Sequence, residues 1–288
     1  VSVSVSVSVS VSVSVSLSLT RTHNANSLSL TSSFSTILGA GMLGLPYAFS
    51  EMGWILGTVL LIVCAAFALL ALFFLAKCAK KTAPPSSFHK VAQLATPGWA
   101  FLIDCVVAVK CFGVATSYLV VVGDLMPLAM LHIAPNSFKL LDRNLWVGIG
   151  FLVVTPLSCL RSLDALRWTS GFSGIFLVFL VSLVVAYALP DTTGLDPCAT
   201  SDDSMDIVSA VVGNASNCHG ERAVLLLSAA SIHVMPIFIF GYACQQNSFG
   251  IVNELENPSI QRINSVFLAS ISSAVVIYII MASAGYLA

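Results

Sequence analysis

Charged side chains are scarce in this sequence. They make up 9% of the 288 residues, whereas apolar residues make up 57%. A soluble domain carries about 25% charged residues, because its surface must be wetted. With a mean hydropathy of +0.95, this chain cannot cover a water-facing surface. The composition therefore excludes an ordinary soluble domain and predicts an all-α, polytopic membrane protein whose partner is the lipid bilayer.

The sequence also lacks a basic field and any metal-ligand spacing. Twelve Lys and Arg face thirteen Asp and Glu, so the net charge of −1 offers nothing to nucleic acid. Most of the cysteines, such as Cys64, Cys105, Cys111 and Cys244, lie in or beside apolar runs. They indicate small packing residues. We expect no nucleic-acid partner, no metal and no cofactor.

The two ends of the chain are unusual. Residues 1–16 alternate Val and Ser without a turn. Period-two alternation is typical of a strand, but the lack of variety favours a disordered tail or a misread repeat in the gene. We divide the chain into a low-complexity tail, 1–30, and a transmembrane domain, 31–288. The chain lacks an initiator Met and stops at Ala288 inside an apolar segment, so we expect both ends to be cut.

Seven segments approach the roughly 20 apolar residues that a helix needs to cross a hydrocarbon core of ~30 Å. They lie near residues 32–50, 54–76, 99–128, 145–160, 168–189, 223–246 and 263–287. The placement of Lys and Arg orients them. With a cytosolic N-terminus, the cytosolic side receives Arg21, Lys77, Lys80, Lys81, Lys90, Arg161, Arg167 and Arg262. The opposite side receives Lys139, Arg143 and Arg222.

The polar loop 190–222 falls on that opposite side. It contains a glycosylation sequon at Asn214. It also contains Cys198 and Cys218, which could form a disulfide on a non-cytosolic face. An unused sequon and two free thiols are the open alternative.

The first apolar segment carries signs of a broken helix. Gly39, Gly41, Gly44 and Pro46 fall within eight residues. Unwound backbone at membrane depth is tolerated where it is buried or lines a cavity. Amides freed by such a break can hold a carboxylate, and freed carbonyls can hold an ammonium group or a cation. A zwitterionic amino acid needs both. Close helix packing through small residues is the alternative.

The sixth segment repeats this pattern, with Pro236 and Gly241 inside an apolar run. Segments one and six are corresponding members of two five-helix repeats. Interrupted helices in corresponding positions of two halves indicate a transporter's midplane site. We therefore predict a substrate-binding site formed by Gly39, Ala40, Gly41, Phe240 and Gly241.

Four separated stretches resemble the amino acid/auxin permease family. They are residues 39–49 (GAGMLGLPYAF), 110–127, 160–170 and 236–258. The pattern is similar to that of fungal vacuolar amino acid transporters and of animal sodium-coupled neutral amino acid transporters. The resemblance implies a secondary active amino acid transporter with an eleven-helix, LeuT-type inverted-repeat fold. It implies alternating access around broken helices 1 and 6, seven helices of the eleven in this chain, and a vacuolar or lysosomal membrane rather than the plasma membrane.

Departures from the family bear on coupling. Ser35 stands where sodium-coupled relatives carry Asn, a better oxygen ligand, and Gln245 stands where the family often has a titratable His. Lys110 and His233 lie near the middle of apolar segments, where an ionisable group is expected to be functional. Ser35, Lys110 and His233 are therefore coupling candidates, with protons expected rather than sodium. Snorkelling of Lys110 toward water and a neutral, hydrogen-bonded His233 stay open.

Other functions fit less well. Residues 171–174 (GFSG) match the nucleophile motif of rhomboid proteases, and His233 follows on a later helix. Ser173, however, falls near the cytosolic start of its segment, whereas His233 falls near mid-depth. We therefore expect no enzyme. A non-transporting amino acid sensor of the same fold and an inactive truncated fragment stay as alternatives.

Overall fold

A computed structural model of the chain describes residues 40–82, 84–133, 142–158, 167–188, 230–255 and 258–287. Within these ranges every regular element is an α-helix or a short 3₁₀-helix, which confirms the all-α prediction. The helices fall into two compact units. The first comprises Val1–Lys77 with Ser170–Ala288, and the second comprises Cys78–Thr169.

Three described helices are long and apolar enough to cross a membrane: Trp54–Lys81, Pro97–Met130 and Ile260–Tyr286. Large apolar side chains point outward from them; Phe67 is 68% exposed and Phe101 is 79% exposed. Surfaces of this kind suit lipid rather than water. The prediction of a multi-pass membrane protein is therefore confirmed. The count of seven crossings and the two inverted repeats stay predictions.

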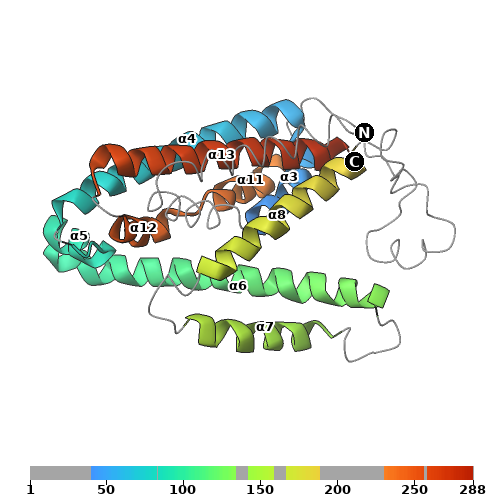
Figure 1. Cartoon of the computed structure of the whole chain (residues 1–288), viewed down its shortest axis with the longest axis horizontal. Coiled ribbons are helices and arrows are strands. Elements are labelled where there is room, and N and C mark those ends of the chain that lie inside the picture. The colour runs from blue at the N-terminus through green and yellow to red at the C-terminus, as the bar shows by residue number, and fades with distance from the viewer. Residues whose placement is uncertain are drawn as a thin grey trace. The chain divides into compact units, whose positions relative to one another are not determined.

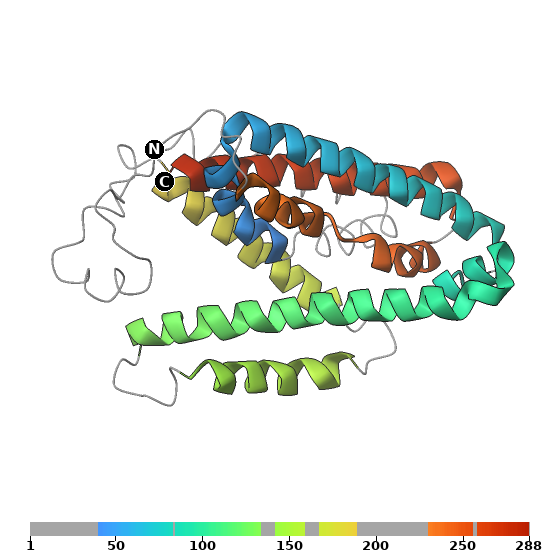
Figure 2. The same cartoon turned by 180° about the vertical axis from the view of Figure 1, so that it is seen from behind.

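The first unit is built around the helices of the first, sixth and seventh apolar segments (Figure 1). In chain order its described elements are η1 (Ala40–Gly44), α3 (Leu45–Met52), most of α4 (Trp54–Lys81), most of α8 (Arg167–Tyr187), α11 (Ala230–Gly241), η5 (Gln245–Asn247), α12 (Ser248–Glu254) and α13 (Ile260–Leu287). Figure 2, the view from behind, shows α3 beside α11, and α3 also packs against α13.

The first apolar segment begins its described part as a 3₁₀-helix, η1, and continues directly into α3. Pro46 lies in the first turn of α3, where its fixed φ suits a helix and its missing N–H costs nothing. Gly53 ends α3 with φ 82°, a value that favours glycine. Its N–H donates to the carbonyl of Phe49 at 2.8 Å. The segment thus extends to Met52, two residues beyond the predicted end.

The sixth segment is interrupted after Gly241. Pro236 lies inside α11, and the helix continues past it although proline removes one backbone hydrogen bond. Tyr242, Ala243 and Cys244 are not helical, and η5 and α12 follow them. The predicted boundary at residue 246 therefore falls inside η5.

The core of the first unit lies between α3, α11 and α13. The buried residues of α3 are Leu45, Ala48, Phe49 and Met52, a spacing that places them on one helical face. The ring of Phe49 stacks with that of Phe238 at a centroid distance of 6.1 Å. On α13 a Cβ added to Gly285 would lie 2.6 Å from Cγ of Pro46. Only glycine permits this approach.

The second unit contains α5 (Phe88–Ala95), η2 (Pro97–Trp99), α6 (Ala100–Ile133) and α7 (Arg143–Ser158). In both views α6 and α7 lie side by side (Figures 1 and 2). The connection between the second and third predicted segments, residues 77–98, is largely helical. α4 continues to Lys81, and α5 and η2 occupy much of the remainder. Lysines extend a helix without difficulty, and the eight residues of α5 are too few to be found by a search for membrane spans.

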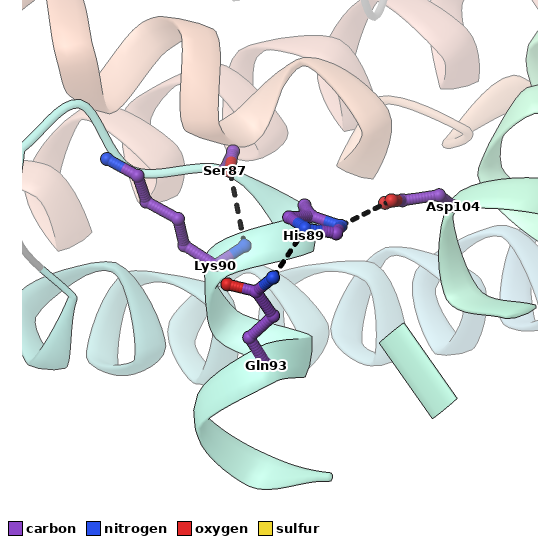
Figure 3. A network of polar contacts seen from close by, with 5 residues as sticks. All are labelled: Ser87, His89, Lys90, Gln93 and Asp104. Atoms are coloured by element: carbon purple, nitrogen blue, oxygen red, sulfur yellow. Dashed lines mark hydrogen bonds and ion pairs between the residues drawn. The ribbon is translucent and has the colours of Figure 1, made fainter. Parts of the chain in front are cut away.

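Polar contacts attach α5 to the start of α6 (Figure 3). The Nδ1 atom of His89 lies 2.5 Å from Oδ2 of Asp104, and its Nε2 atom lies 2.8 Å from Nε2 of Gln93. A neutral ring with its proton on Nδ1 fits both contacts, because it donates to the carboxylate and accepts from the amide. Ser87 caps α5 by accepting from the Lys90 N–H at 3.3 Å.

Candidate substrate site

The backbones of the first and sixth segments meet at two glycines. A Cβ added to Gly41 would lie 2.8 Å from Cα of Gly241, 3.2 Å from its nitrogen and 3.4 Å from Cδ1 of Phe240. Both glycines are buried. Gly41 lies in the 3₁₀ turn that precedes α3, and Gly241 is the last residue of α11. The structure thus brings two irregular ends of membrane segments into direct contact.

The carbonyl of Gly241 accepts a hydrogen bond from a distant tyrosine. The hydroxyl of Tyr278, on α13, donates to it at 2.7 Å in a buried environment. The Tyr278 side chain is 0% exposed. Its ring also meets that of Tyr242 edge-on, with centroids 5.3 Å apart. α13 therefore contacts the interruption of the sixth segment in two ways, by a hydrogen bond to the Gly241 carbonyl and by the packing of Tyr278 against Tyr242.

Two buried oxygens beside this interruption have no hydrogen-bond partner among the described residues: Oη of Tyr242 and Oε1 of Gln246. Buried polar atoms are usually paired, because an unpaired one loses its hydration without compensation. Their presence marks this part of the first unit as a place where a polar ligand or water would be stabilised.

The two segments present helix ends of opposite polarity at this contact. Because η1 runs directly into α3, the backbone amides that a helix start leaves without an intrahelical acceptor belong to the first turn of η1, and such amides favour an anion. The carbonyl at the end of α11 favours a cation or an ammonium group. No side-chain oxygen caps α3 at Gly44. Together these groups offer a carboxylate and an ammonium group complementary partners.

The structure brings three of the five predicted binding residues together. Gly41, Phe240 and Gly241 form the contact described above. Ala40 begins η1, but the structure does not describe its side chain. Gly39 lies outside the described residues, as does the coupling candidate Ser35. The role of these residues in binding stays a prediction.

The two titratable coupling candidates lie on α6 and α11. Lys110 lies on α6 in the second unit, and His233 lies on α11, eight residues or about 12 Å before Gly241. Both side chains are exposed, and neither makes a hydrogen bond or ion pair within the described part of the chain. His233 therefore does not reach the Gly41–Gly241 contact in this structure.

Two side-chain contacts on α6 flank Lys110 along the helix. Asp104 contacts His89, and Asp124 accepts from Nε of Arg143 at 2.7 Å. The two aspartates are twenty residues apart, about 30 Å along a helix, which matches the hydrocarbon thickness of a bilayer. Lys110 lies about 9 Å along the axis from Asp104. Lys110 therefore lies between the two aspartates, about 6 Å along the axis from their midpoint.

The remaining predicted sites are not in the described structure. Asn214, Cys198, Cys218 and the tail 1–30 lie outside the described residues. In the ranges that are described, no group of three His, Cys, Asp or Glu side chains is close enough to hold a metal ion.

Sequence reasoning missed Tyr278. Tyrosine in an apolar segment is usually read as packing or as part of an interfacial belt. The available signal was its position near the centre of the seventh segment, where a hydroxyl must find a partner because water is absent.

The fold and the site define a helical membrane protein in which two irregular membrane segments meet at a pair of glycines. A model of the family described as "Transmembrane amino acid transporter protein" matches residues 26–288. The chain belongs to this family, which confirms the resemblance seen in the sequence.

Several curated proteins are similar to the chain. Vacuolar amino acid transporter 5 of Schizosaccharomyces pombe is 37% identical over 254 residues, which cover 88% of this chain and 55% of that protein. Vacuolar amino acid transporter 6 of Saccharomyces cerevisiae is 34% identical over 259 residues, covering 88% and 53%. Sodium-coupled neutral amino acid symporter 2 of Danio rerio is 26% identical over 264 residues, covering 88% and 51%. The chain spans about half the length of these relatives. No solved structure matches it.

Proposed function

We propose that the protein is a secondary active transporter of amino acids in a vacuolar or lysosomal membrane. The observation that carries this proposal is the contact between Gly41 and Gly241, where two irregular helix ends meet inside the membrane domain. Backbone amides and carbonyls at such ends suit the two charges of an amino acid. Binding and release from alternate sides of the membrane, rather than a chemical reaction, is the activity that this arrangement serves.

The names of the relatives support the substrate and the membrane. Four curated fungal relatives are vacuolar amino acid transporters, 30–37% identical to this chain. The zebrafish relative whose name states sodium coupling is 26% identical. An amino acid substrate is common to all of these names.

We infer that protons are the coupling ion. Lys110 lies at hydrocarbon depth on α6, and its side chain has no ion-pair partner in the described ranges. A charged ammonium group at that depth is costly. An ionisable group inside a membrane segment is typical of the ion pathway of a transporter. Ser35, in place of the asparagine of sodium-coupled relatives, completes the case for protons.

Flux measurements test the proposal. The protein, expressed at the full length of its open reading frame, is reconstituted in proteoliposomes with a pH gradient imposed in either direction in sodium-free buffer. We expect labelled neutral amino acids to accumulate in response to one gradient. Binding without flux would identify a sensor of the same fold. Uptake that a sodium gradient drives and a pH gradient does not would overturn the coupling.

A further inference from the structure

The carbonyls at the end of α11 each find a partner, and one partner is exceptional. The carbonyl of Ile239 accepts from the N–H of Tyr242, and that of Phe240 accepts from the N–H of Ala243. The carbonyl of Tyr242 accepts from the N–H of Cys244 at 2.8 Å and from Nε2 of Gln245 at 3.1 Å. These partners are local, as is usual at a helix end.

Gly241 differs from its neighbours. The partner that its carbonyl has in the structure is the Tyr278 hydroxyl, which lies 37 positions further along the chain. This hydrogen bond occupies the carbonyl oxygen of Gly241, the residue that contacts Gly41. Without it, a buried carbonyl at the interruption would lose its hydration and gain nothing in return.

We propose that Tyr278 controls the access of a ligand to the Gly241 carbonyl. In the unliganded, closed form the phenol hydroxyl occupies this oxygen. The ammonium group of an amino acid takes its place when the interruption opens. This role rests on the proposed function, since it names the residue that competes with the substrate at the site proposed above.

The exchange is physically reasonable because the two partners differ in charge. A hydrogen bond from an ammonium group to a carbonyl is stronger than one from a neutral phenol. The phenol therefore keeps the carbonyl satisfied in the absence of ligand and yields when ligand binds. The closed form, in which the Tyr278 hydroxyl occupies the carbonyl, also lowers the apparent affinity for the amino acid, because only the open fraction of the molecules can bind it.

Tyr278→Phe isolates the hydroxyl. The ring, and with it the edge-on contact with Tyr242, is retained. Removing the bond destabilises the closed form, so we expect the half-saturating amino acid concentration to fall by about two- to tenfold, the factor that one neutral hydrogen bond supplies. The maximal uptake rate should not rise in parallel, because in Tyr278→Phe no hydroxyl competes with the bound ammonium group for the Gly241 carbonyl when the ligand leaves.

A second measurement does not depend on transport. Cys244 is 4% exposed and lies three residues after Gly241. In a variant that retains Cys244 as its single cysteine, alkylation by N-ethylmaleimide reports opening of the interruption. We expect unliganded Tyr278→Phe to be alkylated about two- to tenfold faster than the parent. Tyr187→Phe, at the end of α8, is the matched control and should leave both measurements unchanged.

The outcomes separate this role from others. A higher half-saturating concentration in Tyr278→Phe would mean that the hydroxyl positions the carbonyl for the ligand, and would overturn the competition. Unchanged affinity and unchanged alkylation would also overturn it, since the ligand would then bind elsewhere or at the second lone pair. If the parent protein neither binds nor transports amino acids, the proposed function fails. Faster alkylation of Cys244 would still establish that Tyr278 closes the interruption.

Discussion

At the scale of single residues, the glycine pair changes how a substitution must be interpreted. The sequence favours Gly41 as a binding residue, so a larger side chain there is expected to exclude substrate. In the structure an added Cβ would first meet the backbone of Gly241 at 2.8 Å. Backbone cannot move aside as a flexible side chain can. Loss of uptake in a Gly41 variant would therefore be explained by the disturbed packing alone and would not by itself demonstrate a role in substrate binding.

This contact leads to the first prediction. Gly41→Ala should destabilise the protein by about 1–3 kcal/mol, the usual cost of overpacking. Gly241→Ala should be tolerated better, because its Cβ would lie 3.5 Å from Cε2 of Tyr278, an ordinary contact. Thermal stability in detergent, followed by size-exclusion chromatography, measures both. Equal stability of Gly41→Ala and the parent would show that the two backbones do not meet.

The second prediction concerns Lys110. Lys110→Met removes the charge and keeps most of the apolar stem. It should stop uptake, or uncouple it from the pH gradient in sodium-free vesicles, because the ammonium charge within the apolar segment is lost. Lys80→Met, an exposed lysine near the end of α4, is the control and should behave as the parent. Normal uptake with the same pH dependence would make Lys110 structural, and His233 the next residue to test.

At the scale of elements, the helices of each unit pack through small residues as well as large ones. In the second unit a Cβ added to Gly123 of α6 would lie 2.6 Å from Cγ2 of Val147 on α7. Ten residues earlier on α6, nothing lies within 4 Å of a Cβ added to Gly113. The two glycines share a helix but have opposite surroundings, so they form a natural pair for experiment.

The third prediction uses this pair. Gly123→Ala should weaken the packing of α6 on α7 and lower stability by about 1–3 kcal/mol. Gly113→Ala should be neutral or stabilising by up to about 1 kcal/mol, because alanine is the better helix former. Thermal unfolding of the purified variants compares the two directly. The packing account would fail if Gly123→Ala were at least as stable as Gly113→Ala.

At the scale of the whole molecule, composition and hydrophobic length were sufficient to predict a helical, multi-pass membrane protein. Apolar runs are long, and their free energy of transfer dominates any local preference. Glycine and proline inside two such runs predicted that the helices containing Gly41 and Gly241 would be interrupted and would contribute to one site. Their spacing in the sequence could not show that the interruption follows Gly241 rather than Pro236, because the neighbouring helices decide where a backbone bond can be given up.

Other features were out of reach for different reasons. α5 is short and amphipathic, so a search for membrane-length runs passes over it. Tyr278 is recognisable only once the chain has folded, because its partner lies 37 residues away. The place of Lys110 near the middle of an apolar segment is visible in the sequence. The structure adds the side-chain contacts of Asp104 and Asp124, which flank Lys110 on α6.

The last prediction concerns topology. Three predicted segments separate the link around α5 from the loop 190–222, so an odd number of crossings should place these regions on opposite sides. In a background without the native cysteines, Thr96→Cys, at the exposed end of α5, should react with an impermeant maleimide only from the cytosolic side. Ser201→Cys should react only from the other side.

The sequon at Asn214 gives an independent check on the same arrangement. If the loop 190–222 faces the lumen or the exterior, Asn214 can receive a glycan, and Asn214→Gln should then abolish a shift in electrophoretic mobility that a glycosidase also removes. Labelling of Thr96→Cys and Ser201→Cys from one side would contradict the arrangement, because an even number of crossings would then lie between them. The orientation of segments one and six as opposed members of an inverted repeat would fall with it, since the repeat requires segment one to run outward and segment six inward.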